Sequence, residues 1–89
     1  MEIKVKDVLG EEITIEDAIL LREMIRNNLN VGVALDFEGF DRVPSTFINM
    51  LVGDLLNSFG REFIFKQIYV KNLSNYTDYS RVVLGTTFQ

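Results

Sequence analysis

Two hydroxyl side chains, Ser45 and Thr46, stand where a predicted strand passes through a short acidic loop into a predicted helix. Pro44, directly before them, restricts Val43 to extended geometry, so we expect the helix to begin at once. Ser45 or Thr46 is then the expected N-cap, whose oxygen accepts a hydrogen bond from a free amide one turn in. The same place could carry a phosphate, because free amides and the positive end of the helix dipole favour an anion there. A structural cap and a phosphoacceptor therefore both remain open.

The loop before these hydroxyls is acidic. Asp36, Glu38 and Asp41 precede the helix, and Arg42 is the nearby cation that could hold a phosphate. A phosphate adds about two negative charges, so it would change the surface that a partner meets. No base, nucleophile or set of metal ligands accompanies these carboxylates, and we expect neither catalysis, nor a metal, nor a cofactor.

The helix after the hydroxyls carries a candidate surface for a protein partner. Six residues recur at helical spacing and form an apolar face for the core: Ile48, Leu51, Val52, Leu55, Leu56 and Phe59. Met50 lies outside this face, in an arc that it shares with Gly53 and Asp54, and Phe47 lies at the margin. Met adapts its shape to a partner and Gly permits close approach. Either other parts of the chain cover these residues, or they contact a partner.

The periodicity of the whole chain predicts a small α/β domain with a short, mainly parallel sheet and helices packed on it. The predicted elements are a strand at 3–8, a helix at 13–29, a strand at 31–37, a helix at 45–59, a strand at 67–72 and a helix at 74–84. The first strand alternates apolar and charged residues like an edge strand. The second is apolar on both faces, which predicts a central strand covered on both sides.

Capping and core residues follow from the same patterns. Thr14 is the expected N-cap of the first long helix, Ser74 that of the last, and Gly60 the stop of the helix between them. Two sets of residues are expected to face the core: Ile15, Ala18, Leu21, Ile25 and Leu29 in the first helix, and Tyr76, Tyr79 and Val83 in the last.

Composition narrows the class of protein. The 89 residues, 47% hydrophobic and 25% charged, suit one small domain, and the chain contains no cysteine and no histidine. The net charge of −4 makes nucleic acid and anionic membranes poor partners. No apolar run approaches the about 20 residues that span a bilayer, and the N-terminus lacks the apolar stretch of a signal peptide, so we expect a cytoplasmic protein.

Around residues 33–60 the chain resembles the STAS superfamily, the fold of bacterial anti-sigma-factor antagonists, and more closely a STAS-like family of unassigned function. The similarity runs from about residue 13 to 73, through LREMIRNNL, VALDF, STFINMLVGDLL and IYVKNL. In the antagonists, a turn like Asp-Ser-Ser-Gly follows the strand, and an ATP-binding anti-sigma kinase phosphorylates its serine. Residues 44–47 occupy that turn, so Thr46 falls at the phosphoacceptor and Ser45 just before it. Pro44 replaces the acidic residue and Phe47 the glycine, so the resemblance supports the fold more strongly than the phosphorylation.

We therefore expect a non-catalytic regulatory domain that binds a protein through residues 38–54, with Ser45 or Thr46 as a phosphorylation switch. The resemblance implies an ATP-binding, kinase-like regulator as the partner. The expected contact residues are Glu38, Asp41, Arg42, Phe47, Met50, Gly53 and Asp54. The alternative is an unmodified assembly or inhibitor protein, either a homodimer or a plug of another complex encoded by a mobile element.

Overall fold

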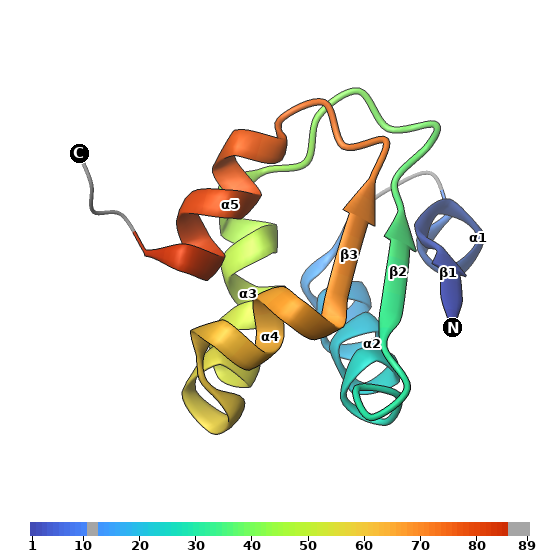
Figure 1. The fold of residues 1–89 in the computed structure, drawn as a ribbon. Coiled ribbons are helices and arrows are strands. Elements are labelled where there is room, and N and C mark those ends of the chain that lie inside the picture. Colours follow the sequence, from blue (N-terminus) through green and yellow to red (C-terminus); the bar gives the residue numbers. More distant parts are fainter. Residues whose placement is uncertain (11–12, 86–89) are drawn as a thin grey trace.

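The computed structural model describes residues 1–10 and 13–85 and shows an α/β arrangement of three strands and five helices in that part of the chain (Figure 1). In chain order these are β1 (Glu2–Lys4), α1 (Val5–Leu9), α2 (Ile15–Arg26), β2 (Val33–Asp36), α3 (Ser45–Phe59), α4 (Arg61–Gln67), β3 (Ile68–Lys71) and α5 (Tyr76–Leu84). The predicted fold class is confirmed, and α3 has the bounds expected from the sequence.

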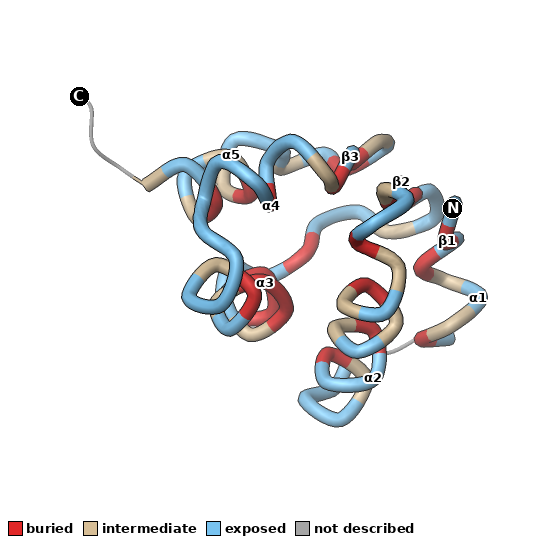
Figure 2. Tube along the Cα trace, turned by 60° about the horizontal axis from the view of Figure 1, so that its bottom comes forward, coloured by how far each residue is buried: buried red, intermediate tan, exposed pale blue. Residues whose placement is uncertain are grey.

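The three strands form one parallel sheet in the order β1-β2-β3. Ile3, Leu35 and Val70 are aligned across it and are all buried, which places one face of the sheet on the core. α2 and α3 lie behind that face in Figure 1, and buried residues gather between them and the sheet in Figure 2. β2 is therefore the central strand, as predicted.

The expectation that β2 is covered on both sides is wrong. The opposite face of the sheet carries Glu2 and Lys4 on β1, Ala34 on β2 and Tyr69 on β3, and Tyr69 is 65% exposed. Strand order follows chain order without a reversal, so crossovers of one hand put α2 and α3 on the same face. A Lys71–Glu2 ion pair of 2.9 Å spans the open face from β3 to β1.

The first predicted strand is too long. β1 stops at Lys4 and α1 follows at once, because Val5 and Leu9 are four residues apart and both are buried, as one face of a helical turn requires. Gly10, with φ of 78°, ends α1 in a conformation that residues with a side chain rarely adopt.

The first long helix begins as expected. The Thr14 hydroxyl accepts a hydrogen bond of 3.2 Å from the Asp17 amide, and Ala18, Leu21 and Ile25 are fully buried. Ile15 departs from the prediction, because it is 61% exposed. It lies at the margin of the buried face and turns towards α3 instead of the sheet.

The last third of the chain differs most from the prediction. α4 was not expected, whereas β3, at Ile68–Lys71, lies within the strand predicted at 67–72. α5 begins after Asn75, so Ser74 is not its cap, and Tyr76 is 42% exposed and not in the core. Tyr79 and Val83 are buried as predicted. Across the described ranges, no helix has both the length and the apolar character that spanning a bilayer requires.

Candidate functional site

The start of α3 shows what the two hydroxyls do in the fold. Pro44 is the N-cap residue, and its carbonyl oxygen accepts hydrogen bonds from Phe47 N at 3.0 Å and Ile48 N at 3.2 Å. The expectation that Ser45 or Thr46 caps the helix is therefore wrong, because both already belong to its first turn. Pro fits the cap position since its fixed φ brings the carbonyl into line without a side-chain bond.

Ser45 and Thr46 are both exposed, and neither hydroxyl makes a hydrogen bond to any other residue in the described part of the chain. The one contact at Ser45 uses its backbone oxygen, which accepts from Asn49 Nδ2 at 3.0 Å. The fold thus leaves both hydroxyl oxygens accessible at the amide-rich end of a fifteen-residue helix.

A clamp formed by Ser74, Asn75 and the first turn of α5 fixes the chain directly before α3. The Asn75 side chain accepts from Val43 N at 3.2 Å and donates to Val43 O at 2.7 Å. One residue earlier, Arg42 Nη2 donates to Asp78 Oδ2 at 3.1 Å. The Ser74 hydroxyl donates to the backbone oxygen of Asp41. Arg42, the expected partner of a phosphate, is therefore already paired, although its side chain remains 66% exposed.

The other end of the acidic loop belongs to the sheet. Asp36 is only 6% exposed, and its Oδ1 accepts from Asn72 Nδ2 at 2.8 Å and from Glu38 N at 3.0 Å. The Asn72 hydrogen bond, then the Glu38 amide, hold the pKa of Asp36 below its ordinary value, although burial opposes this shift. Lys71 and Lys4 lower it further. Asp36 is thus a charged link between the ends of β2 and β3.

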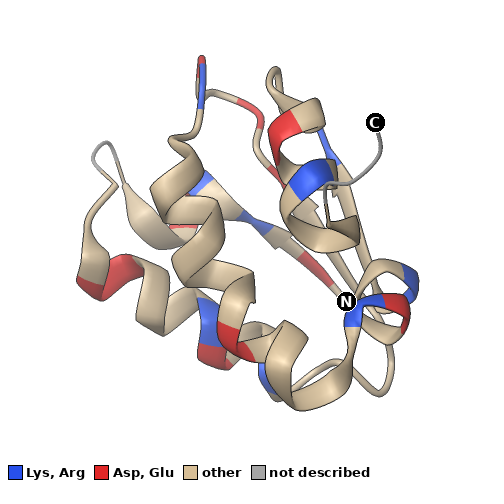
Figure 3. Cartoon of the chain, turned by 90° about the vertical axis from the view of Figure 1, so that its left-hand side faces the viewer, with Lys and Arg blue, Asp and Glu red and all other residues tan. Residues whose placement is uncertain are grey.

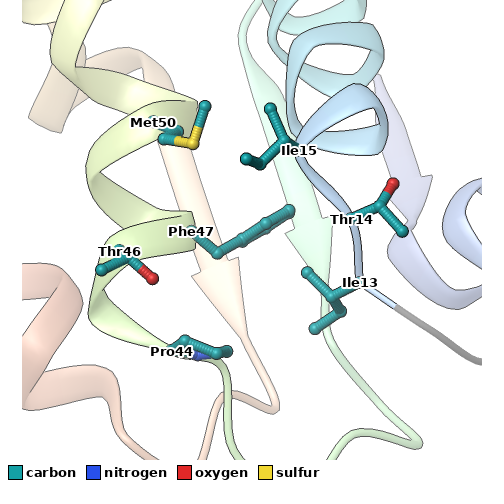
Figure 4. Close-up of a pocket in the computed structure, with 7 residues that line it drawn as sticks. All are labelled: Ile13, Thr14, Ile15, Pro44, Thr46, Phe47 and Met50. Carbon is teal, nitrogen blue, oxygen red and sulfur yellow. The ribbon is translucent and has the colours of Figure 1, made fainter.

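A small apolar groove lies between the first turns of α2 and α3 (Figure 4). We call it the α2/α3 groove; its volume is about 110 Å³ and it is lined by Ile13, Thr14, Ile15, Pro44, Thr46, Phe47 and Met50. Phe47 reaches across from α3 towards the start of α2 and is 5% exposed, so it forms the floor. Met50, half-buried, faces Ile15 across the opening.

An ion pair holds the two helices together farther along. Arg26 Nη2 of α2 lies 3.1 Å from Asp54 Oδ2 of α3, and Arg26 Nε lies 3.4 Å from Glu23 Oε2. Asp54 is the one charged residue of α3, every residue of which is described (Figure 3). The surface between Thr46 and Asp54 is consequently uncharged on its α3 side.

The expected contact residues fall into two groups in space. Thr46, Phe47 and Met50 line the α2/α3 groove, with Ser45 beside them and Gly53 and Asp54 continuing along α3. The remaining members are loop residues outside the lining of the groove, namely Glu38, Asp41 and Arg42. Arg42 lies two residues before the N-cap Pro44, whereas Glu38 lines a separate hollow with Lys4, Lys6, Asp7 and Asp36.

Sequence reasoning missed the α2 wall of the groove. Ile15 was expected in the core, whereas both it and Ile13 line the opening next to Met50. The available signal was the position of Ile15 beside the cap Thr14, at the edge of the apolar arc of the helix. Within the described ranges no group of three or more Asp or Glu residues is placed to hold a metal ion.

The comparisons with known proteins bear on this fold. A family model with the description "STAS-like domain of unknown function (DUF4325)" matches residues 17–78, well over half of the 89-residue chain. The matched range runs from the first turn of α2 to the first turn of α5 and contains the whole of residues 38–54. No curated protein and no solved structure was found to match the chain.

Proposed function

This chain belongs to the family of STAS-like domains of unknown function, and on that premise we propose that it is a non-catalytic regulatory domain that binds another protein. The contact surface is residues 38–54, and phosphorylation of Ser45 or Thr46 changes the contact. The partner is an ATP-binding, kinase-like regulator that also supplies the phosphoryl group, in the cytoplasm of a bacterium.

One observation carries this proposal: the hydroxyls of Ser45 and Thr46 are exposed and unused by the fold, beside an uncharged helix face and an apolar groove. A helix N-terminus tolerates a phosphate because its first amides lack intrahelical partners. Transfer from ATP would form a bond from the hydroxyl oxygen to phosphorus, release ADP and free the hydroxyl proton. The fold would survive this change, whereas a partner would meet about two new negative charges.

Arg42 gives the switch a physical consequence. Its guanidinium is bound to Asp78 of α5 and is largely exposed, so it can exchange partners without unfolding the core. A phosphate on Ser45 carries more charge than the Asp78 carboxylate and would compete for Arg42. We therefore infer that phosphorylation loosens the link from the loop to α5 and alters the surface around Asp41.

The test compares capture of partners from extract of the native host by three forms of the domain. The wild type and the Ser45→Ala, Thr46→Ala variant should capture the same protein, and the Ser45→Glu, Thr46→Glu variant should capture much less of it. The matched control is Thr77→Glu, which adds an acid at another exposed residue, in α5. Equal capture by all forms would overturn the switch, and intact mass of the native protein would show whether phosphate is present.

The second candidate function is an unmodified assembly protein, for instance a homodimer. The exposed Ile15 and the half-buried Met50 favour it, because apolar side chains at a groove are buried when two copies associate. Sedimentation of the wild type as a dimer, a Met50→Asp variant as a monomer, and native protein without phosphate would favour this function over the switch. A monomeric wild type would rule out the homodimer.

A further inference from the structure

The two walls of the α2/α3 groove continue as apolar stripes along the helices. Ile15 and Ile19, four residues apart on one side of α2, are 61% and 42% exposed. On α3, Thr46, Met50 and Gly53 follow one another at spacings of four and three residues. Ile15, Thr46 and Met50 line the groove, and Ile19 and Gly53 follow them along the helices, outside its lining. We call the strip of surface between these two rows, from the groove to the Arg26–Asp54 ion pair, the channel.

Gly53 is a gap in this channel that the domain itself does not need. A Cβ at Gly53 would meet no atom within 4 Å, and the backbone is ordinary α-helix with no positive φ. Glycine lowers the stability of a helix relative to alanine. A glycine that neither packing nor backbone explains, on the wall of an apolar channel, suits the close approach of a second backbone.

The walls of the channel favour a helix as its occupant. Beyond their first turns, both walls are α-helices whose backbone amides and carbonyls bond within the helix and offer nothing to a neighbour. An extended segment buried there would leave its own backbone groups without partners. A helix satisfies its backbone internally and can place apolar side chains between two neighbouring helices.

A negative charge at the mouth of the channel favours a basic occupant. Glu16, three residues before Ile19 and on the same side of α2, makes no ion pair with any residue of the described ranges. The arginines farther along α2 are already partnered, Arg22 with Glu23 and Arg26 with Glu23 and Asp54. A second copy of the chain would bring like charges together at this mouth, and an anionic lipid surface would be repelled.

We propose that the channel between α2 and α3 binds an amphipathic helix of a protein partner. Its apolar side chains seat on Ile15, Ile19 and Met50, its backbone approaches Gly53, and its lysines or arginines lie beside Glu16. This inference rests on the proposed function, because it names the kind of segment that the same surface binds. It adds the α2 wall, which the loop and the phosphorylation switch do not require.

The experiment is selection from a displayed library of 18-residue helical peptides, with the wild-type domain as bait. Enriched peptides should carry apolar residues at i, i+3 or i+4 and i+7, and more Lys and Arg than the starting library. Their affinity should fall at least about tenfold for Ile19→Asp, which buries a charge in the contact. Glu16→Gln should weaken binding less, and higher salt should weaken the wild-type complex.

The matched control is Leu20→Asp. Leu20 is 51% exposed on the same helix, but one residue on from Ile19 it is turned by about 100° away from the channel. It should leave peptide binding unchanged, and circular dichroism should show that both variants fold. Equal loss in both variants, enrichment of acidic peptides, or no enrichment would overturn the proposal, as would a wild-type dimer that Ile19→Asp dissociates.

The two proposals fail in different ways. Capture of a native partner that Ser45→Glu, Thr46→Glu abolishes and Ile19→Asp leaves intact would overturn the helix channel and keep the proposed function. The helix channel would be supported and the switch overturned if Ile19→Asp abolishes peptide binding while the Ser45→Glu, Thr46→Glu variant still captures the native partner. If the Ser45→Glu, Thr46→Glu variant loses native capture and Ile19→Asp loses both native capture and peptide binding, with Leu20→Asp unaffected, both proposals are supported.

Discussion

The side chain of Asn75 pairs with the backbone of Val43 in both directions, accepting from its nitrogen at 3.2 Å and donating to its oxygen at 2.7 Å. Val43 is fully buried, so water is poorly placed to replace either bond. The amide of Asn75 therefore acts as the backbone partner that this residue of the loop lacks. It holds the chain in the extended form from which Pro44 starts α3.

We predict that Asn75→Ala lowers the free energy of unfolding by about 1–3 kcal/mol, because two buried backbone groups lose their partner. Urea denaturation measures the change, and amide hydrogen exchange should accelerate at Val43. Asn57→Ala is the control, since Asn57 is exposed on α3 and makes no hydrogen bond through its side chain within the described ranges. An equal effect of the two substitutions would show that the clamp contributes nothing.

The hydroxyl of Tyr79 is buried without a hydrogen-bond partner among the described residues, and the side chain is 2% exposed. We predict that Tyr79→Phe raises the free energy of unfolding by about 1 kcal/mol, because an unsatisfied polar group leaves the core while the ring stays. Tyr69→Phe, at a residue 65% exposed, should change it little. A loss of stability in Tyr79→Phe would mean that the hydroxyl is bonded after all.

Tyr79 also predicts a pH dependence. Burial, with a smaller effect of Tyr76, raises the pKa of Tyr79 above its ordinary value of 10.0. The unfolded chain then loses this proton before the folded chain does, so stability is complete below pH 10 and falls as the pH rises above it. Tyr79→Phe should flatten this alkaline loss in urea titrations between pH 9 and 11, relative to wild type. The same slope in both proteins would contradict the assignment.

The sequence predicted most where one local rule determines the structure. Thr14 caps α2, Gly60 follows α3, and apolar spacing located most of the buried face of both helices. Ile15 and Phe59, also expected on the core faces, are instead 61% and 41% exposed. The prediction failed at Ser45 too, where serine at a helix start suggested a cap but the preceding Pro44 already serves as one. The preference of serine for the cap position was outweighed there by the fixed φ of Pro44.

Other parts depend on long-range arrangement. The open face of the sheet follows from strand order, which periodicity in β2 does not reveal. Ile15 is exposed because it lines the groove between the first turns of α2 and α3. The two short helices α1 and α4 were missed because helices of five and seven residues carry too few apolar repeats. The α3 part of the candidate site was therefore predictable and the α2 part was not.

The hydrogen bond from Asn72 lowers the pKa of Asp36, and a titration of Asp36 can test this effect. Because the pKa of Asp36 is lowered, its contribution to stability is present above its ordinary value of 3.8 and is lost as the pH falls through the lower folded value. We predict that Asn72→Gly moves the pKa of Asp36 up towards 3.8, as measured by NMR of the carboxyl carbon. Glycine is the right replacement because Asn72 has φ of 60°, which alanine would strain.

Lys71→Met provides the comparison for this titration. Lys71 acts on Asp36 only through its charge and ranks behind the hydrogen bonds from Asn72 and Glu38 among the causes of the shift. The pKa of Asp36 should therefore rise less in Lys71→Met than in Asn72→Gly. The reverse order would show that charge, and not the hydrogen bond, keeps Asp36 ionised.

Substitution of Gly53 should affect the stability of the free domain and its binding of a helix in opposite directions. We predict that Gly53→Ala raises the free energy of unfolding by about 0.5–1 kcal/mol, because the new methyl group meets no atom and alanine favours the helix. Gly60→Ala is the matched control: its Cβ also meets no atom, but φ of 88° strains any side chain, so stability should fall by about 1–2 kcal/mol.

If the channel binds a helix, the same methyl group that stabilises the free domain must stand between the two backbones. Gly53→Ala should therefore weaken binding of the selected helical peptides while it raises the midpoint of urea denaturation. These opposite changes are informative, because a variant that merely disturbs the fold loses both stability and peptide affinity. Unchanged peptide affinity in a stabilised Gly53→Ala would show that no backbone approaches this position, and would move the partner to the mouth of the groove at Ile15 and Phe47.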